Sequence, residues 1–361
     1  MAPAKTPSRR LARRIFIFLL LAGGILFGVW WQFVRPGTNL APLGGSPNVP
    51  PPPAFEKFEE ERPLMGTLFR IVAYGTEGDA TRRAMSEAFR RADEIATACS
   101  DYDPQSELSM LGEAPTGRPQ EVSPTLAAVL AHARGVADVT DGAFDPTLGA
   151  LTSLWRAARD TREMPDPAVL EEARATSGWK NFTIDPVKRL VTVNTPGLKF
   201  DLGGIAKGFA ADEMLSVLRD AGITRALIAA GGDIRLGNPP PDAPAWRVGL
   251  RTLGPEVSEF IRVSNCAVST SGDLHQFIEI GGNRYSHIID PATGLGLTRR
   301  IAATVVAPTA VQSDPLATFC CIRPEAARAA FTAGDIACRI VVADRGFDDR
   351  PSRNFPQIDR F

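Results

Sequence analysis

The hydrophobic pattern of the chain starts with an apolar run over residues 15–34, which is broken only by Gln32. Such a run is long enough for a helix that crosses the hydrocarbon core of a bilayer. Arginines precede it, and Trp30 and Trp31 stand at its far end. The positive-inside rule and the interfacial preference of tryptophan then place the N-terminus in the cytoplasm. We therefore expect residues 1–35 to form a basic flank and a transmembrane anchor.

A cleaved signal peptide is the alternative for this segment. The apolar run is long for the hydrophobic part of a signal peptide, and no small-x-small cleavage site follows it, so the pattern favours an uncleaved anchor. Residues 36–55 are rich in Pro and Gly and include four consecutive prolines, which predicts an extended, semi-rigid spacer. Together these features predict a single-pass protein of the inner (cytoplasmic) membrane, with its folded part on the periplasmic, extracytoplasmic side.

Residues 56–343 carry the patterns of a folded catalytic domain, and the polar residues 344–361 are expected to form a tail without an element of its own. Helices are expected over 79–99, 124–139, 148–155 and 205–218 and from residues 311 and 324. Strands are expected over 67–73, 182–184, 190–193, 199–202, 226–230, 246–250, 260–263, 267–270, 276–280, 284–289, 302–306 and 340–342. Hairpin-linked strands with helices grouped between them predict an α+β fold, with mixed, largely antiparallel sheets and flanking helices.

The composition of the 361-residue chain is that of an ordinary globular protein, with 44% hydrophobic and 22% charged residues. Its 40 Lys and Arg side chains stand against 41 Asp and Glu side chains, and no stretch interleaves aromatic and basic residues. Nucleic acid is therefore not an expected partner. The five cysteines include no Cys-x-x-Cys pair and no Cys/His cluster with zinc spacing, which favours buried cysteines over a zinc site.

Residues 201–208, Asp-Leu-Gly-Gly-Ile-Ala-Lys-Gly, place a carboxylate, two glycines and a lysine where a strand is expected to lead into a helix. Backbone N–H groups at a helix start attract phosphate oxygens, and Lys207 would lie about one turn into the same end. The segment has neither the frame of a P-loop nor that of a dinucleotide fingerprint. The alternative is structural: the glycine pair makes a tight turn and Asp201 caps the helix.

Residues 286–294 place His287 after a strand and Asp290 three residues later, beside a proline. An imidazole titrates near neutral pH, so His287 could take a proton from a hydroxyl nucleophile. A hydrogen-bonded histidine beside a turn explains the same position equally well.

Residues 313–318, Ser-Asp-Pro-Leu-Ala-Thr, lie at the expected start of another helix. Asp314 and Thr318 are four residues apart and share one helical face. With a free backbone carbonyl they would offer the hard oxygen ligands that Mg²⁺ prefers. The alternative is that Ser313 or Asp314 caps the helix, with Pro315 just inside it.

Taken in order, these segments resemble the ApbE family of FAD:protein FMN transferases. The resemblance extends over Met65-Gly66-Thr67, Tyr102 with 103–109, Asp-Gly-Ala-Phe-Asp-Pro-Thr at 141–147, 200–208, Gly-Gly-Asp at 231–233, Ser-Thr-Ser-Gly at 269–272, 285–294 and 313–318. It implies a Mg²⁺-dependent enzyme that splits FAD at its pyrophosphate. FMN would pass to a threonine hydroxyl of an acceptor protein, and AMP would leave.

The resemblance also implies roles for residues of this chain. By position, the FAD site is expected to contain Met65, Tyr102, Ala143, Phe144, Asp145, Asp201, Lys207 and His287, and the Mg²⁺ site Gly204, Asp314, Ala317 and Thr318. Gly204 and Ala317 would contribute backbone carbonyls, and Tyr102 could stack on a flat ring of FAD. His287, with Asp290 beside it, is the candidate proton acceptor, and Lys207 could neutralise charge on the phosphates.

The chain lacks the Ser/Asp-Gly-Ala-Thr type of acceptor sequence, because Asp141-Gly142-Ala143 is followed by Phe144. We therefore expect the acceptor threonine on another chain, an exported or membrane-tethered redox protein. Two other functions would use the same residues: an FAD pyrophosphatase that gives FMN and AMP, and a non-catalytic, membrane-anchored FAD-binding protein. An assay with FAD, Mg²⁺ and an acceptor peptide separates the three.

Overall fold

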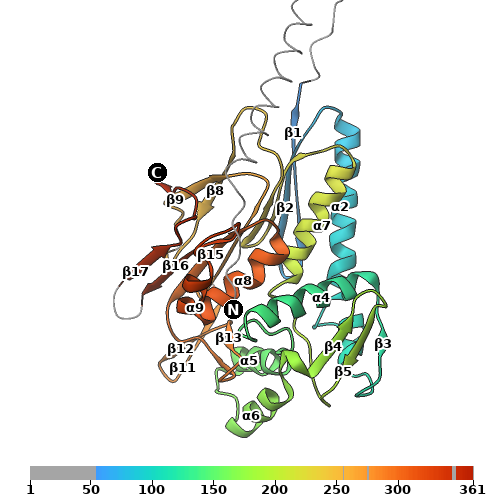
Figure 1. Ribbon diagram of the computed structural model, residues 1–361, viewed down its shortest axis with the longest axis vertical. Coiled ribbons are helices and arrows are strands. Elements are labelled where there is room, and N and C mark those ends of the chain that lie inside the picture. The colour runs from blue at the N-terminus through green and yellow to red at the C-terminus, as the bar shows by residue number, and fades with distance from the viewer. Residues whose placement is uncertain (1–53, 255, 275, 344–346, 361) are drawn as a thin grey trace, which may run out of the picture. The chain divides into compact units, whose positions relative to one another are not determined.

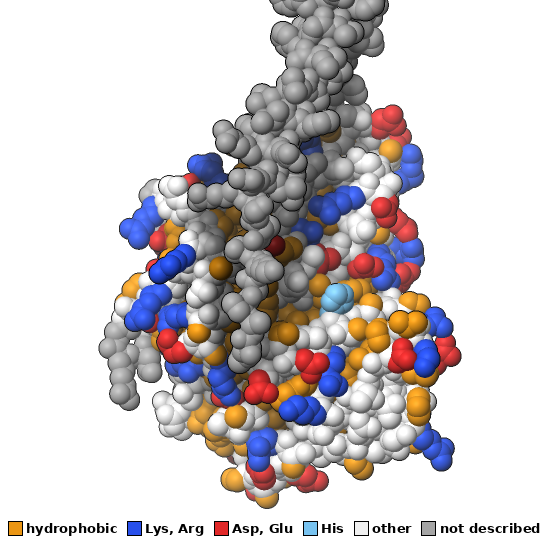
Figure 2. Space-filling model, in the orientation of Figure 1, with side chains coloured by type: hydrophobic (Ala, Val, Ile, Leu, Met, Phe, Trp, Pro, Cys, Tyr) orange, Lys and Arg blue, Asp and Glu red, His pale blue; other side chains and the backbone are white. Residues whose placement is uncertain are grey.

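The structure, a computed structural model, describes residues 54–254, 256–274, 276–343 and 347–360, all of which fall in the unit that begins at Pro53. The expected transmembrane anchor and the spacer up to residue 53 lie outside the described residues. Within the described ranges, no helix is both long enough and apolar enough to cross a bilayer. Figure 2 shows that basic and acidic side chains alternate over the visible face of the folded unit.

An eight-stranded sheet forms the centre of the fold, in the order β1-β2-β6-β7-β10-β15-β16-β17 (Figure 1). Each neighbouring pair of strands is antiparallel. β15 is buried along its whole length, as its sequence predicts for a central strand, since it is apolar apart from Thr304. The strands are Glu56–Leu64 (β1), Thr67–Gly75 (β2), Arg225–Ala230 (β6), Asp233–Leu236 (β7), Ala267–Gly272 (β10), Ile301–Ala307 (β15), Ala337–Ala343 (β16) and Phe347–Pro351 (β17).

Smaller antiparallel sheets accompany the main one in the described part of the chain: β3-β5-β4, β18-β9-β8, β11-β12 and β13-β14. His287 lies in the link between the last two of these, after β12 and before β13. The strands are Gln120–Glu121 (β3), Phe182–Asp185 (β4), Leu190–Val193 (β5), Trp246–Leu250 (β8), Glu259–Val263 (β9), Phe277–Ile280 (β11), Asn283–Ser286 (β12), Ile289–Asp290 (β13), Leu295–Gly296 (β14) and Asp359–Arg360 (β18).

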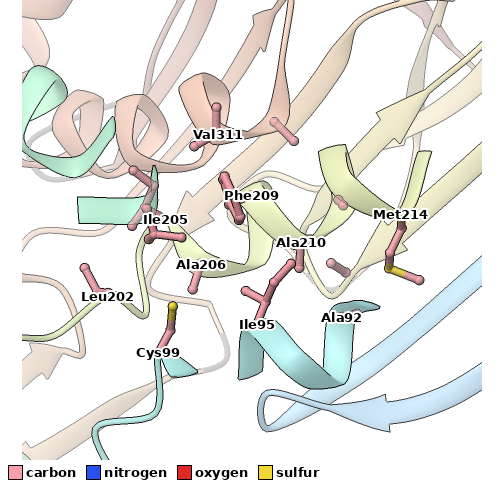
Figure 3. Close-up of a cluster of buried hydrophobic side chains, with 14 of the residues drawn as sticks. Ala92, Ile95, Cys99, Leu202, Ile205, Ala206, Phe209, Ala210, Met214 and Val311 are labelled. Atoms are coloured by element: carbon pink, nitrogen blue, oxygen red, sulfur yellow. The ribbon is translucent and has the colours of Figure 1, made fainter. Parts of the chain in front are cut away.

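In the described part of the chain, the helices with the most extensive packing against the main sheet are α2 (Gly78–Ala98), α7 (Ala206–Asp220) and α8 (Ala310–Ile322). α7 lies beside both α2 and α8 (Figure 1). Figure 3 shows Ile95 of α2, Phe209 of α7 and Val311 of α8 in one cluster of buried side chains. This shared core fixes the start of α7 against α8. The remaining helices are α3 (Glu107–Gly112), α4 (Pro124–Val139), α5 (Gly149–Thr161), α6 (Pro167–Thr176), α9 (Pro324–Ala330) and the 3₁₀ turn η1 (Trp179–Asn181).

The structure confirms the expected α+β class and the antiparallel sheets with flanking helices. It corrects the strand expected over 199–202, where a single bridge joins Lys199 to Leu148 and no ladder forms. The Asp201 N–H donates instead to the carbonyl of Pro146 (2.8 Å). The alternating pattern of this segment therefore reflects burial of Phe200 and Leu202 in the core and not membership of a sheet.

Both edge strands of the main sheet depart from the sequence prediction. β1 is unexpected because six of its nine residues are charged, yet charged side chains suit an edge strand, where they oppose pairing with other chains. The structureless tail expected after residue 343 is corrected, since β17 pairs with β16 and β18 pairs with β9. Buried Arg339 pairs with Asp349 (2.6 Å). This polar segment is therefore attached to the sheet by an ion pair, and not by the burial of an apolar face.

Candidate active site

A buried cluster of one lysine and two aspartates lies where α7, β7 and α8 meet. Lys207 Nζ lies 3.2 Å from Asp233 Oδ2 and 3.3 Å from Asp314 Oδ2, and it donates to the carbonyl oxygen of Gly203 (2.8 Å). Asp233 and Asp314 are only 4% and 3% exposed. The fold therefore joins the two expected segments 201–208 and 313–318 through one ammonium group.

The position of Asp314 depends on a close approach of α8 to α7. Gly208 permits this approach, because a Cβ atom there would lie 2.2 Å from the carbonyl oxygen of Ala310. The Gly208 N–H donates to Asp314 Oδ2 (3.1 Å). Further along α7, Asp212 accepts the N–H groups of Ala310 and Val311 (3.1 and 2.8 Å). A side chain of α7 thus caps the first turn of α8, which has no cap from its own N-cap residue.

The charge in this cluster is not balanced, because two carboxylates share one ammonium group. Burial raises the pKa of Asp314 to about 7, and repulsion by Asp233 adds to the shift, while attraction by Lys207 opposes it. Burial alone would lower the pKa of Lys207, but attraction by Asp233 and then by Asp314 outweighs burial and raises it. The lysine therefore stays charged at neutral pH, and the excess negative charge favours a cation.

Two of the residues expected to hold Mg²⁺, Gly204 before α7 and Thr318 of α8, lie close to each other. Thr318 Oγ1 lies 3.8 Å from the point that a Cβ atom of Gly204 would occupy, and the Ser271 hydroxyl lies 3.4 Å from the Thr318 hydroxyl. Asp314 and Ala317 precede Thr318 on the same helix. In the described region no three His, Cys, Asp or Glu side chains form a metal cluster, so a cation here needs hydroxyl and carbonyl oxygens as well. Such hard donors fit Mg²⁺.

Two expected FAD-site residues border the glycine turn before α7. The Asp201 carboxylate accepts the Gly203 N–H (2.8 Å) and the Thr152 hydroxyl (2.7 Å), which ties the turn to α5. The ring of Phe144 is buried against Gly204, where a Cβ atom would lie 3.3 Å from it. Both residues therefore shape the turn that would face a phosphate group.

Asp145 and Ala143, also expected in the FAD site, lie in a loop that the fold holds tightly. The Asp145 carboxylate accepts the N–H and the hydroxyl of Thr147 (2.8 and 2.6 Å) and the N–H of Trp179 (3.0 Å). Burial raises the pKa of this carboxyl group. Ala143 is buried in the apolar cluster that includes much of α8. The side-chain contacts of Asp145 are those of a residue that holds a loop in shape.

Tyr102 lies at a cavity of about 230 Å³ that Lys199 and Phe200 also line. The Arg156 guanidinium lies 3.9 Å from the centre of the Tyr102 ring and pairs with Asp101 (2.7 Å). The tyrosine is nevertheless 77% exposed. An aromatic ring supported in this way and still open to solvent suits stacking on a flat ligand.

Met65 belongs to the two-residue turn of the β1–β2 hairpin. Its φ is 48° and that of Gly66 is 70°, as in the turns that best match the twist of a hairpin. The hairpin reaches the buried cluster, because the Gly231 N–H donates to the carbonyl of Leu68 (3.2 Å) and Asp233 follows two residues later.

One hydrogen bond determines which ring nitrogen of neutral His287 carries the hydrogen. Its Nδ1 lies 3.0 Å from the carbonyl oxygen of Gln276, which can only accept, so Nδ1 carries the hydrogen and Nε2 can accept a proton. Surrounding protein displaces water from the ring and lowers the pKa of His287, and the charge of Lys207 lowers it further, although part of the side chain reaches solvent.

Asp290 is engaged elsewhere. Both of its carboxylate oxygens accept hydrogen bonds from Arg323 (2.8 and 2.9 Å), and Oδ1 also accepts the N–H of Ala292 (3.0 Å). Burial would raise the pKa of Asp290, but the hydrogen bonds from Arg323 and Ala292 and the charges of Arg323 and Arg299 together outweigh burial and lower it. Within the described ranges no hydrogen bond joins Asp290 to His287, so the expected pairing of these two side chains is not observed.

Sequence reasoning assigned no role to three residues that the structure places at the site. These are Asp233, which pairs with Lys207, Thr152, which binds Asp201, and Arg156, which lies over Tyr102. Two signals were available for Asp233: it belongs to the Gly-Gly-Asp segment of the resemblance, and it precedes the apolar Ile234, where a charged residue is seldom buried without a partner. Thr152 and Arg156 lie on an amphipathic helix that offers no such signal.

Comparisons with known proteins identify the family of the chain. A sequence profile described as the ApbE family matches residues 65–340. The FAD:protein FMN transferase of Vibrio cholerae is 32% identical over 302 residues, which cover 81% of this chain and 90% of the relative. That of Treponema pallidum is 32% identical over 278 residues, which cover 71% of this chain and 76% of the relative.

Solved structures show the same fold. A histidine-to-glycine variant of the flavin transferase ApbE from Vibrio cholerae superposes with a TM-score of 0.75 at 32% identity. The ApbE protein from Thermotoga maritima superposes with a TM-score of 0.76 at 29% identity. Each comparison covers 83% of this chain and 98% of the solved chain. The profile, the relatives and the shared fold together show that the chain belongs to the ApbE family of FAD:protein FMN transferases.

Proposed function

We propose that this chain transfers FMN from FAD to a threonine hydroxyl of an acceptor protein, with Mg²⁺ bound, and releases AMP. Family membership supports flavin transfer as the reaction class. The observation that carries the finer proposal is the buried cluster of Lys207, Asp233 and Asp314 beside the glycine turn. Phosphoryl transfer depends mainly on positioning and on neutralising charge, and this cluster offers both.

Each group of the site has a part in this reaction. Asp314, Thr318 and the carbonyls of Gly204 and Ala317 would hold Mg²⁺, which when bound neutralises charge on the pyrophosphate oxygens. The N–H groups at the start of α7 would bind phosphate oxygens, with the Lys207 ammonium close by.

His287 would act as the general base, since its Nε2 would accept the proton of the threonine hydroxyl. The threonine oxygen forms a bond to the phosphorus of FMN, the bond from that phosphorus to the AMP oxygen breaks, and AMP leaves. The proton rests on the imidazole until the product departs.

The proposed role of His287 predicts a specific pH dependence. At saturating Mg²⁺ the transfer rate should fall only below the ordinary histidine pKa of about 6.5, because the pKa of His287 is lowered and the neutral, accepting form persists to lower pH. His287→Asn should remove this inflection from the rate–pH profile and lower kcat by about 10²-fold or more. An unchanged inflection in the variant would show that another group titrates.

Thr318 provides a matched pair of variants for the cation. Thr318→Val keeps the side-chain shape and removes the hydroxyl, and it should raise the Mg²⁺ concentration at half-maximal rate by about tenfold or more. Thr318→Ser retains the hydroxyl and should stay within about threefold of the parent. Equal Mg²⁺ dependence of the two variants would remove Thr318 from the cation site.

The direct test incubates the full-length chain with FAD, Mg²⁺ and a peptide that contains Asp-Gly-Ala-Thr. Fluorescent flavin bound covalently to the peptide, with an equal amount of AMP, supports transfer. Free FMN with AMP would indicate an FAD pyrophosphatase, and unchanged bound FAD would indicate an FAD-binding protein. The same peptide with valine in place of threonine is the control.

We also propose that the acceptor is a separate, extracytoplasmic chain and that an N-terminal anchor holds the enzyme at the inner membrane. The apolar run at 15–34, the arginines before it and the proline-rich stretch after it support this arrangement. Fractionation of cells that express the full-length chain should recover it with the membranes, and recovery in the soluble fraction would contradict the anchor.

A further inference from the structure

We propose that Asp233 is a positioning residue that retains the Lys207 ammonium group when a divalent cation binds Asp314. The inference rests on the proposed function, because it requires that cation. It gives a role to a buried carboxylate that is neither among the oxygens proposed to hold Mg²⁺ nor in contact with them through a hydrogen bond.

Lys207 has three partners from three parts of the fold. Its Nζ contacts Asp233 at 3.2 Å, Asp314 at 3.3 Å and the carbonyl oxygen of Gly203 at 2.8 Å. An ammonium group carries three hydrogens, so each partner can take one. If Asp314 no longer contacts the ammonium, Asp233 and the carbonyl of Gly203 remain. Of these two, only Asp233 carries a negative charge that balances the ammonium.

A cation at Asp314 would compete with Lys207 for the same carboxylate. Both are positive, Asp314 Oδ2 already faces the ammonium, and like charges repel strongly in a buried site. Without Asp233 the ammonium would then keep only the carbonyl of Gly203, and a buried charge without a counter-charge is strongly destabilised. With Asp233 it remains paired and stays beside the glycine turn.

Asp233 is well placed to hold the lysine still. It starts β7 and is flanked in the main sheet by Ala230 of β6 and Ser269 of β10. The Ser269 hydroxyl lies 2.7 Å from the Ser313 hydroxyl, and Ser313 immediately precedes Asp314. The sheet therefore fixes Asp233 relative to α8, and Lys207 can shift its contact from one carboxylate to the other without moving its helix.

The test is a double-mutant cycle on the binding of Mg²⁺ alone, measured by titration calorimetry on the purified full-length chain without FAD. Asp233→Asn removes the charge but keeps the shape, and it should weaken Mg²⁺ binding by about tenfold, because Lys207 then stays on Asp314. Lys207→Met removes the competitor and should bind Mg²⁺ at least as tightly as the parent. In that background, Asp233→Asn should change the affinity by about threefold or less.

Other roles of Asp233 give other results. If Asp233 were itself a cation ligand, Asp233→Asn would weaken Mg²⁺ binding by the same factor in the parent and in the Lys207→Met variant. If it only supported the fold, Mg²⁺ affinity would stay constant while the melting temperature fell. Either result overturns the proposal. Should Asp233→Asn fail to fold, Lys207→Met still decides, because weaker Mg²⁺ binding than in the parent contradicts competition.

Two further variants make the outcome specific. Asp349 lies on the edge strand β17 and neutralises the buried Arg339 of β16. Asp349→Asn removes this carboxylate and should leave Mg²⁺ binding unchanged. Asp314→Asn tests the cation site itself. If Mg²⁺ binding is indifferent to Asp314, the proposed function is wrong about the cation. If binding depends on Asp314 but the cycle shows no coupling, only the role of Asp233 is wrong.

Discussion

Asp314→Ala is expected to lower the rate of FMN transfer by about 10³-fold or more, because the reaction loses its main charge-stabilising group. Asp314 is the only carboxylate among the residues proposed to hold Mg²⁺, and it is 3% exposed. Lys207 keeps Asp233 as a partner in the variant, so the ammonium is not left unpaired. The rate is measured as covalent flavin fluorescence on an acceptor peptide over a series of Mg²⁺ concentrations.

Two comparisons separate damage to this site from damage to the fold. Asp349→Asn also removes a partner of a buried cation, Arg339, and it should transfer FMN at the parent rate. Thermal unfolding of Asp314→Ala should remain close to that of the parent, because the lost contacts with Gly208 and Lys207 are offset by removal of a carboxylate that burial and Asp233 destabilise. A variant as fast as the parent at limiting Mg²⁺ would exclude Asp314 as a cation ligand.

The sequence predicts the segments of the site but not their assembly. Lys207 and Asp314 are each recognisable locally, one after a glycine pair and the other at a helix start, yet the contact between them spans 107 positions. No periodic pattern in the sequence predicts a contact over that separation. The packing of α7 on α8 creates the contact. Asp233 escaped prediction for the same reason, because an aspartate after two glycines also fits an ordinary turn.

The helices and strands, like the site, are predictable only where a local sequence pattern determines them. The helix predicted over 79–99 is observed as Gly78–Ala98, because one apolar face along its length dictates both its conformation and its burial. β1, β17 and β18 are stabilised by pairing with neighbouring strands and by ion pairs, so their own polar patterns do not predict them. The alternating pattern of residues 199–202 misleads in the opposite direction, since the core buries Phe200 and Leu202 without a ladder.

Gly208→Ala should have the next largest effect, although it adds a single methyl group. The new Cβ atom would lie 2.2 Å from the carbonyl oxygen of Ala310 and 3.0 Å from the Cβ of Asp314. The first neighbour is backbone, so α8 must move away from α7. Overpacking of this kind destabilises a protein by about 1–3 kcal/mol. The Asp314 carboxylate would also shift from the Gly208 N–H and Lys207, and displacement of about 1 Å can cost 10²-fold in rate.

Gly135→Ala is the matched control for this change. Gly135 also lies inside a helix, α4, but a Cβ atom there would meet nothing within 4 Å. Replacing it should stabilise the fold by about 0.5–1 kcal/mol, because alanine has the higher helix propensity, and it should leave the transfer rate unchanged. Urea unfolding and the flavin-transfer assay on both variants provide the comparison. If Gly208→Ala behaved like Gly135→Ala in both measurements, the close approach of α7 and α8 would not be what positions Asp314.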